Sequence, residues 1–546
     1  MAFDTAKYKV PDTNLAPPAN ALYVATNGVD TNAGTQAAPL RTPLAAVKKV
    51  ANGGTIVVRA GVYYDVALGS PNKKFNLQAY PHEQVYFLGS VRVTAWTKEN
   101  AYWKAAFANT LPNVTCPKEA VNPSYPMACK PEQVFVNGVP LLQVAALSDV
   151  TTGKFYQPTG SQWVYIGTDP TSKVVEVVKV ERGLELLPGG AGSLFAGIGF
   201  AQYGSRWGDY AAAVISNAEN VTISQCLFTQ NSGRGLSIDR PKQIVRDSIF
   251  SYNGLAGING NRCHGLTITR NVFTNNNMAR FETQNCGAYC TIAAVKINHA
   301  QNVRVDLNSF VDNFAPGLWF DLGCTDAVVT RNWITGNQGT GLFYEVSARA
   351  IIASNVFWKN TVYGVKLAGS DHPKYQLGLW EDLRIACNKN DAYSCEQKLT
   401  WDTTNTIIRN NLFSNGQNFG LVVIGSTQVH AYHYIEAMDH NGYFRADSSV
   451  SPLVHWCNTT EKEWVDYQTH TPFKEATRLD LTPPSISIRD VPTNPFFVNK
   501  TAGNFNLTPN SVARSAGTAL PADIAAALGV AASPVDMGKP CSPFTG

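Results

Sequence analysis

A phrase that recurs along the middle of the chain constrains its fold more than any other feature. Each copy is rich in Asn and β-branched residues, and Asn or Gly turns and a short alternating apolar strand follow it. The copies end at Phe228, Phe250, Phe273, Phe310, Ile334, Phe357 and Phe413. Four of the intervals are 22, 23, 24 and 23 residues long, which is typical of one coil of a parallel β-helix. The remaining intervals of 37 and 56 residues indicate coils that carry insertions.

Apolar residues alternate within each predicted strand, so one set points into the core and the other points outward. Leu318 with Phe320, and Leu342 with Tyr344, belong to the inward set. Aromatic residues in the outward set favour a binding surface, whereas a solvated face is the alternative for its small polar members. Two outward ladders result, Ser237, Asn259, Lys296, Trp319, Phe343, Lys366 and then Asp239, Asn261, Asn298, Asp321, Glu345.

The predicted fold class is all-β, a right-handed parallel β-helix with a small antiparallel β domain inserted and an N-terminal capping helix. Residues 1–97 are expected to form the N-terminal cap and first coils, with the helix near Pro43 to Val50. Residues 98–187 lose the period and contain a hairpin-type Asn137-Gly138 turn, which predicts the inserted module. Residues 188–546 are expected to form the main β-helix, with loop insertions near 279–292 and 370–400 and a C-terminal cap.

Composition excludes several classes of partner. A net charge of +4 without a basic run gives no reason to expect a nucleic-acid partner. The chain also has no stretch of 18 uncharged apolar residues, so no membrane insertion is expected. Oligomeric state cannot be predicted from these features.

Eleven cysteines favour an oxidising compartment, and the chain is expected to be secreted or periplasmic. It begins without the charged and apolar regions of a signal peptide, so export implies that one has been removed. The odd count leaves a free thiol, and Cys226 is expected to be buried. Zinc is the alternative for Cys286-x-x-x-Cys290, but no matching His or Cys pair accompanies that spacing. The short separations predict three disulfides, Cys116–Cys129, Cys286–Cys290 and Cys387–Cys395.

Asp321 and Glu345 are the candidate catalytic residues. Each follows its repeat position by 11 residues, so both fall at the same place in neighbouring coils. Strands in neighbouring coils lie about 4.8 Å apart, which puts the two carboxyl groups roughly 5 Å apart. Retaining glycosidases hold their two carboxyl groups about 5–5.5 Å apart, and the pKa of one of two close acids rises. Chance stacking of acids along a long solenoid is the alternative.

The segments Gly317-Leu-Trp-Phe-Asp-Leu322 and Leu342-Phe-Tyr-Glu-Val-Ser347 resemble motifs of the glycoside hydrolase family 120 β-xylosidases and of the related family 141 enzymes. Those families have pectate-lyase-like β-helices with an inserted β domain. The resemblance implies that Asp321 is the nucleophile and Glu345 the acid/base. The xylosidases continue with a His-Gly-Pro motif, whereas this chain has Ala348-Arg-Ala. The resemblance therefore does not predict the substrate of this protein.

The neighbours of the acids are consistent with a carbohydrate substrate. Lys296 and Lys366 flank the acids and could bind an anionic group, and Trp319 offers a ring face to a pyranose. No cofactor or metal is expected, because Trp319 and Phe343 leave few oxygen ligands for calcium. The insertions could wall a pocket, which favours exo-action. The remaining candidate substrate-binding residues are Phe343, Asp239 and Asn261 on the strands and Arg280, His372 and Trp380 in the loops.

Three other functions remain open. A polysaccharide lyase or epimerase could use Lys296 or Lys366 to remove the proton next to a uronate carboxylate. A non-catalytic carbohydrate-binding solenoid would need no paired acids. Transglycosylation would use the same pair as hydrolysis.

Overall fold

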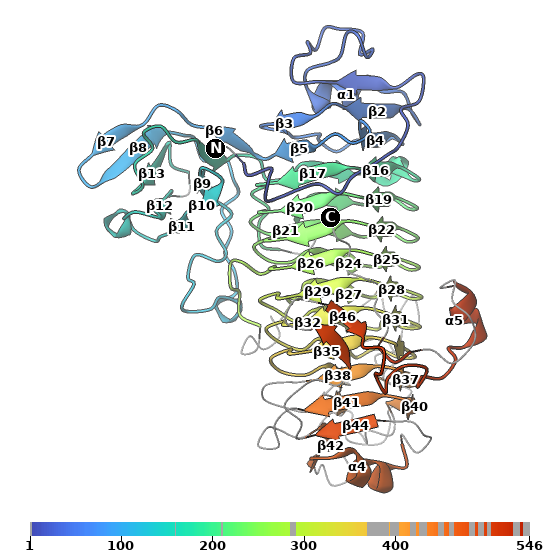
Figure 1. Cartoon of the computed structure of the whole chain (residues 1–546). Coiled ribbons are helices and arrows are strands. Elements are labelled where there is room, and N and C mark those ends of the chain that lie inside the picture. The colour runs from blue at the N-terminus through green and yellow to red at the C-terminus, as the bar shows by residue number, and fades with distance from the viewer. Residues whose placement is uncertain are drawn as a thin grey trace. The chain divides into compact units, whose positions relative to one another are not determined.

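The fold is the predicted right-handed parallel β-helix (Figure 1). The computed structural model describes residues 3–158, 160–208, 211–283, 291–368, 393, 403, 405–414, 422–424, 434–445, 453–457, 464–479, 486–489, 496–499, 504–527 and 536–538. The chain divides into two compact units. The first comprises mainly Met1–Asn259 with Asn275–Ile292, and the second comprises Gly260–Thr274 with Ala293–Thr545.

Three parallel ladders form the coils of the first unit. Helix α1 (Pro43–Lys49) lies at the predicted position, and the Thr42 hydroxyl caps it by accepting the N–H of Ala45. One ladder contains β1 (Leu22–Val24), β2 (Thr55–Val58), β4 (Asn76–Ala79), β16 (Leu194–Ala196), β19 (Thr222–Ser224) and β22 (Ile244–Arg246). A second contains β3 (Gly61–Tyr63), β5 (Val85–Leu88), β17 (Ile198–Ala201), β20 (Leu227–Thr229) and β23 (Ile249–Ser251). The third contains β15 (Leu184–Leu186), β18 (Ala212–Ser216) and β21 (Arg234–Ile238).

A mainly antiparallel module lies within the same unit (Figure 1). Positive φ angles of 52° at Asn137 and 76° at Gly138 make the tight turn between β9 and β10, as the Asn-Gly signal predicts. One sheet contains β6 (Ser90–Arg92), β9 (Val134–Val136), β10 (Val139–Pro140) and β14 (Val175–Val178), and the other contains β7 (Thr97–Glu99), β8 (Tyr102–Ala106), β11 (Leu142–Gln143), β12 (Lys154–Tyr156) and β13 (Trp163–Ile166). Short 3₁₀ turns cover Lys118–Ala120, Leu147–Asp149 and Pro188–Gly190.

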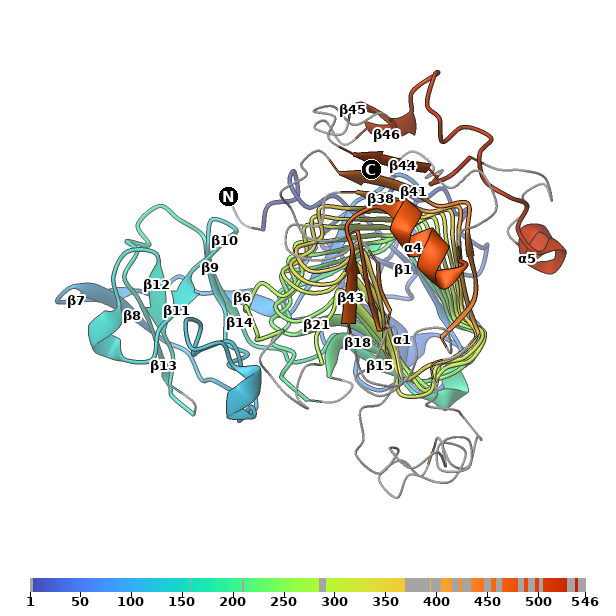
Figure 2. The ribbon, with the colours of Figure 1, turned by 90° about the horizontal axis from the view of Figure 1, so that it is seen from below.

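The second unit is also built from coils of three strands, and within it the strands superpose from coil to coil in Figure 2. One ladder contains β25 (Thr267–Thr269), β28 (Arg304–Asp306), β31 (Val328–Thr330), β34 (Ile351–Ala353), β37 (Thr406–Arg409) and β40 (Ile435–Asp439). The next contains β26 (Val272–Thr274), β29 (Ser309–Val311), β32 (Trp333–Thr335), β35 (Val356–Trp358), β38 (Leu412–Ser414), β41 (Gly442–Arg445) and β44 (Ile486–Arg489).

The third ladder of the second unit carries the candidate acids. It contains β27 (Val295–Asn298), β30 (Leu318–Asp321), β33 (Leu342–Glu345), β36 (Val365–Ala368), β39 (Val422–Ile424), β42 (Val454–Cys457) and the antiparallel β43 (Trp464–Tyr467), and β24 (Ile258–Asn261) precedes β27 in its order. The remaining described elements are α4 (His470–Thr477), α5 (Ala522–Ala527) and the antiparallel pair β45 (Phe497–Asn499) and β46 (Asn504–Leu507).

The repeat positions are in register, as the sequence period predicts. Phe310 pairs with Ile334, Ile334 with Phe357, and Phe357 with Phe413 on neighbouring strands. The rings of Phe357 and Phe413 stack 5.2 Å apart, although 56 residues separate them. In the first unit, Phe228 and Phe250 stack in the same way at 4.7 Å.

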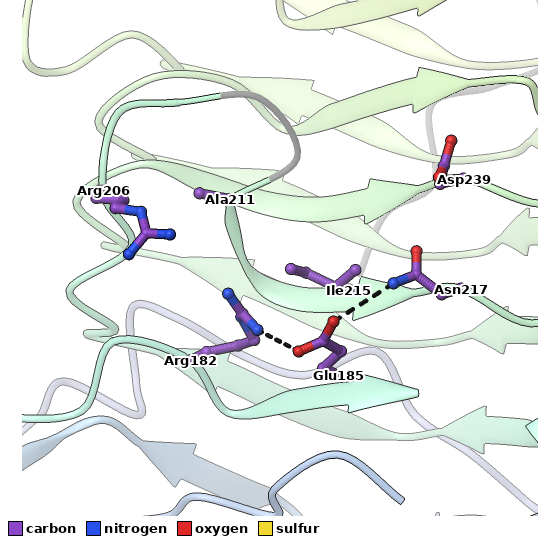
Figure 3. A pocket seen from close by; sticks show the side chains of 7 residues that line it. All are labelled: Arg182, Glu185, Arg206, Ala211, Ile215, Asn217 and Asp239. Carbon is purple, nitrogen blue, oxygen red and sulfur yellow. Dashed lines mark hydrogen bonds and ion pairs between the residues drawn. The ribbon is translucent and has the colours of Figure 1, made fainter. Parts of the chain in front are cut away.

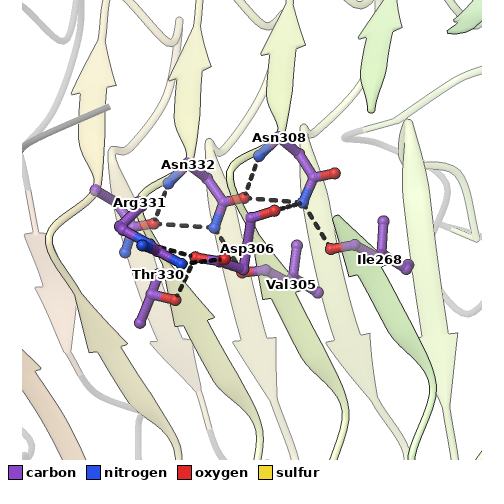
Figure 4. Close-up of polar contacts among 8 residues, drawn as sticks. Ile268, Val305, Asp306, Asn308, Thr330, Arg331 and Asn332 are labelled. Atoms are coloured by element: carbon purple, nitrogen blue, oxygen red, sulfur yellow. Dashed lines mark hydrogen bonds and ion pairs between the residues drawn. The ribbon is translucent and has the colours of Figure 1, made fainter. Parts of the chain in front are cut away.

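Buried Asn side chains join the turns of successive coils. Asn332 donates from Nδ2 to Asn355 Oδ1 at 3.0 Å and to the carbonyl oxygen of Val305 at 2.8 Å (Figure 4). The same pattern satisfies the other amides of this ladder. Beside this ladder, Asp306 accepts hydrogen bonds from Thr330 and Arg331, each at 2.8 Å (Figure 4). The ladder runs through Asn271, Asn308, Asn332, Asn355, Asn411 and Asn441.

The cysteine predictions are confirmed where the structure describes the residues. A disulfide joins Cys116 and Cys129. Cys226 is a buried free thiol, and Cys263 and Cys324 are two more. The other two predicted pairs, Cys286–Cys290 and Cys387–Cys395, lie outside the described residues.

Candidate active site

Asp321 and Glu345 end two neighbouring parallel strands, β30 and β33. Pairing of Trp319 with Phe343 and of Phe320 with Tyr344 fixes the register of these strands. Phe320 and Tyr344 are fully buried in the core. The alternation of a strand therefore places both acids on the opposite, outward side. At the usual strand spacing of about 4.8 Å, the two carboxyl groups are expected to be roughly 5 Å apart.

Asp321 is held by an ion pair. The Nζ atom of Lys296, one coil earlier on β27, lies 2.8 Å from Asp321 Oδ2. The other carboxylate oxygen accepts the backbone N–H of Leu322 at 2.8 Å. Only 5% of Lys296 and 8% of Asp321 are exposed. These contacts hold a carboxylate in one orientation inside a poorly solvated site.

Four side chains form a column beside the acids, in the order of strands β27, β30, β33 and β36. Lys296 Nζ lies 3.5 Å from the centre of the Trp319 ring, and the Phe343 ring stacks on Trp319 at 5.1 Å. Lys366 Nζ lies 4.4 Å from the centre of the Phe343 ring. Cation–π contacts of this kind stabilise both charges against an aromatic face. We call Lys296, Trp319, Phe343 and Lys366 the aromatic column.

The expectation that this face is exposed is wrong for most of its members. Trp319 is 6% exposed, and Lys296 and Phe343 occupy its two ring faces, so no pyranose can stack on it in this arrangement. Trp319 instead donates from Nε1 to Glu345 Oε2 at 3.1 Å. Its indole therefore orients the second acid.

Glu345 is the acid that the site keeps protonated near neutrality. Burial raises its pKa to about 7, and the negative charge of Asp321 adds to the rise. Lys366, Lys296 and the Trp319 hydrogen bond act in the opposite direction without cancelling it. A carboxylic acid of this kind can give a proton to a leaving oxygen at neutral pH.

Asn298 is a further site residue, which the sequence places on the outward ladder of the acids but does not mark as a binding residue. It pairs with Asp321 across β27 and β30. Its Oδ1 atom is buried and has no hydrogen-bond partner among the residues that the structure describes. A buried amide oxygen without a partner costs free energy, and such an atom can accept a hydrogen bond from a ligand.

The described part of the 370–400 insertion is Tyr393. Its hydroxyl lies 2.6 Å from His264 Nε2, and the Arg262 guanidinium lies 4.2 Å from its ring centre. The neighbouring His299 donates from Nδ1 to Oδ1 of Asn261 at 2.8 Å, because an amide oxygen can only accept. Tyr393 thus contacts the residues that follow β24 and β27, a position that nothing in the sequence indicates.

Four other predicted site residues stay predictions: Asp239, Arg280, His372 and Trp380. Asp239 and Arg280 belong to the first unit, and their part in the site stays a prediction. Asp239 lines a hollow of that unit together with Arg182 and Arg206. His372 and Trp380 lie outside the described residues.

The described residues contain neither a cluster suited to a metal ion nor a helix suited to a membrane. Among those residues, no group of three or more His, Cys, Asp or Glu side chains could hold a metal ion. None of the described helices is long and apolar enough to cross a membrane.

Comparisons with known proteins agree with the β-helix fold. Residues 211–378 match the family model described as a right-handed β-helix region. XylC in complex with xylose superposes with a TM-score of 0.53 at 14% identity, covering 80% of this chain and 86% of XylC. This likeness confirms a β-helix fold and extends no further. No curated protein matches the chain.

Other β-helices with different activities are also similar. A lacto-N-biosidase from Eubacterium ramulus has a TM-score of 0.39 at 10% identity, covering 86% of this chain and 67% of its own. The A-module of a mannuronan C-5 epimerase from Azotobacter vinelandii has a TM-score of 0.36 at 14% identity, covering 73% of this chain and 87% of its own. The names of these two neighbours are those of a glycosidase and of an epimerase.

Proposed function

We propose that this protein is a secreted or periplasmic retaining glycoside hydrolase, with Asp321 as nucleophile and Glu345 as acid/base. One observation carries the proposal: two acids in register on neighbouring coils have opposite environments. Asp321 is ion-paired with Lys296, whereas the pKa of Glu345 is raised to about 7. A spacing of roughly 5 Å fits the retaining geometry, because inverting enzymes need about 6.5–9.5 Å to admit a water.

The first step follows from these environments. Asp321 attacks the anomeric carbon and forms a glycosyl ester while Glu345 donates its proton to the leaving oxygen. Lys296 and the N–H of Leu322 keep the attacking carboxylate in place. Trp319 holds Glu345 through its indole N–H. Positioning of this kind lowers the barrier because the reacting groups need no reorganisation.

The second step uses the coupling between the two acids. Once Asp321 is an ester, its negative charge no longer raises the pKa of Glu345. Lys296 and Lys366 still act to lower that pKa, so it falls and Glu345 becomes a base. Glu345 then removes a proton from a water whose oxygen attacks the anomeric carbon. The bond to Asp321 breaks, Asp321 leaves as a carboxylate, and the sugar is released with retained configuration.

Asn298 is proposed to bind the hydroxyl next to the carbon that Asp321 attacks. Asn298 pairs with Asp321 on the neighbouring strand, and its Oδ1 atom would accept a hydrogen bond from that hydroxyl. Replacing Asn298 by Ala should lower kcat/KM by about 10- to 100-fold on the normal substrate, because one hydrogen bond is lost. The same replacement should have little effect on the corresponding 2-deoxy glycoside.

This prediction is checked by comparing both substrates with the parent protein and with Asn298→Ala. Asn20→Ala, at an exposed position in the first unit, serves as the control and should behave as the parent does. Equal losses on the normal and the deoxy substrate would show that Asn298 does not act on that hydroxyl.

The proposal is tested by a screen of the parent protein against plant, algal and bacterial polysaccharides and aryl glycosides. Reducing ends and unsaturated-uronate absorbance are followed together, and the anomer first released is identified by proton NMR. We expect new reducing ends, no such absorbance, and release of the anomer that the substrate carries. The double variant Asp321→Asn/Glu345→Gln serves as the blank. An inverted product would contradict the nucleophile role of Asp321.

A lyase or epimerase is less well supported by the site. Its base would be Lys296 or Lys366, but the Nζ atom of Lys296 is already held by Asp321 Oδ2 at 2.8 Å in a buried ion pair. Unsaturated-uronate absorbance that survives in the blank would favour this reaction and would overturn the hydrolase.

A further inference from the structure

The first unit contains a polar hollow that the reaction at the acid pair does not use. Its volume is about 260 Å³. It is lined by Arg182, Glu185, Arg206, Ala211, Ile215, Asn217 and Asp239 (Figure 3). We propose that this hollow binds one uncharged sugar ring, independently of the acid pair.

Three stacked coils build the hollow. Glu185 on β15 pairs with Ile215 on β18, so their side chains stand on the same outward face. Asn217 and Asp239 each follow directly after the paired residues Ser216 and Ile238, so they leave neighbouring strands at the same level. The site therefore rests on the regular ladder and is held by rigid strands.

Hydrogen-bond donors gather on one side of the hollow. The guanidinium groups of Arg182 and Arg206 face the same space in Figure 3. Arg182 is ion-paired with Glu185, and Arg206 NH1 lies 3.3 Å from Glu181 Oε1. The Nε atom of Arg182 is buried and has no hydrogen-bond partner within the described ranges of the chain. A buried N–H without an acceptor is costly, and a ligand oxygen would satisfy it.

Acceptors and an apolar surface complete the lining. The Glu185 carboxylate accepts hydrogen bonds from the Asn217 amide at 3.5 Å and from the Ser70 hydroxyl at 3.3 Å. Both distances are long, so a ligand hydroxyl could form a shorter hydrogen bond with this carboxylate. Asp239 carries a second carboxylate at the other end of the hollow. Ile215 and Ala211 lie between the charged groups and offer C–H surface.

This mixture of groups fits a neutral polyhydroxylated ring. Two arginines and two carboxylates line the hollow, so it has no net charge with which to recruit an ion. A sugar hydroxyl both donates and accepts, so adjacent hydroxyls match a guanidinium beside a carboxylate. The volume lies below the range of about 300–1,000 Å³ for drug-sized ligands, which favours one ring over a longer segment.

The test is isothermal titration calorimetry of the full chain with D-xylose, D-glucose and D-galactose, and with D-glucuronate and sulfate as charged probes. We expect at least one neutral sugar to bind. Arg182→Met should weaken that binding by about tenfold or more, because it removes charge-assisted hydrogen bonds. Arg182→Lys keeps the charge but lacks Nε, and should weaken binding as well.

Two controls separate this site from the acid pair. Arg246→Met removes an arginine whose side chain is 42% exposed and which pairs with Asp247, and it should leave sugar binding unchanged. Glu345→Gln should also leave this binding unchanged, so a failed hydrolase proposal would not affect the result. Binding that is insensitive to both Arg182 variants overturns the inference, as does the absence of any sugar binding. Arginine-dependent binding of glucuronate or sulfate alone would identify an anion site instead.

Discussion

Replacing Glu345 by Gln is expected to lower kcat/KM by about 10²- to 10⁴-fold on a substrate with a poor leaving group, since that is the usual contribution of general acid–base catalysis. The amide keeps the size and the acceptor oxygen for the Trp319 N–H, but it cannot supply a proton. Aryl glycosides with an acidic phenol should be affected less in the first step, because their leaving group needs little protonation. Steady-state kinetics on both substrate types measure the difference.

The pH dependence should change in the same variant. The parent needs protonated Glu345, so its activity should fall as the pH rises through about 7. This fall should be absent from the residual activity of Glu345→Gln. Glu219→Gln, at an exposed position, is the matched control and should keep the parent profile. A variant with full activity, or with the parent's alkaline limit, would remove Glu345 from the mechanism.

The raised pKa also makes a prediction about stability. A carboxyl group whose pKa is higher in the folded state stabilises the fold through its protonated form. That contribution is fully present below the unfolded pKa, near 4.5, and is lost as the pH rises through about 7. Glu345→Gln should remove this part of the pH dependence. Chemical denaturation of parent and variant at several pH values provides the readout.

Replacing Lys296 by Met is expected to lower the free energy of unfolding by about 3–5 kcal/mol, the usual cost of breaking a buried ion pair by removing one partner. Asp321, 8% exposed, would be left as a buried charge that still accepts the N–H of Leu322 but has lost its ion pair. Trp319 would also lose the ammonium on its ring face. Guanidinium denaturation of the variant gives the change in stability.

The surface pair Arg349–Asp326 provides the matched comparison. Its side chains are 50% and 38% exposed, so Arg349→Met should cost no more than about 1 kcal/mol. Adding Asp321→Asn to Lys296→Met should restore much of the lost stability, because no buried charge is then left without a partner. If both variants lost a similar free energy of unfolding, breaking the buried ion pair would cost no more than breaking the exposed one.

The residue positions that the coil repeat determines could be predicted from the sequence. The constant interval from Phe310 to Asp321 and from Ile334 to Glu345 placed both acids one coil apart, and the strand register agrees with that placement. A period of two also separates inward from outward residues. It says nothing about what covers the outward side, so the burial of Trp319 between Lys296 and Phe343 could not be predicted.

Contacts that depend on loops or on single atoms could not be predicted from the sequence either. Tyr393 reaches His264 from a segment without any periodic pattern. The unpartnered oxygen of Asn298 becomes visible only when its neighbours are placed. Arg182 and Arg206 lie outside the repeated motif, so of the charged residues that line the hollow of the first unit the sequence indicated Asp239 alone.

The pairing of Phe357 with Phe413 has a consequence for how such a protein can change. The coil between them contains 56 residues, more than twice the 23 of the coil before it, yet the two rings stack at 5.2 Å. Loop length is therefore decoupled from the spacing of the strands. A lineage could exchange the segment after β36 for one of another length and alter which sugars are accepted, while the acids one and two coils away kept their separation. Substrate range and reaction chemistry can then evolve as separate traits.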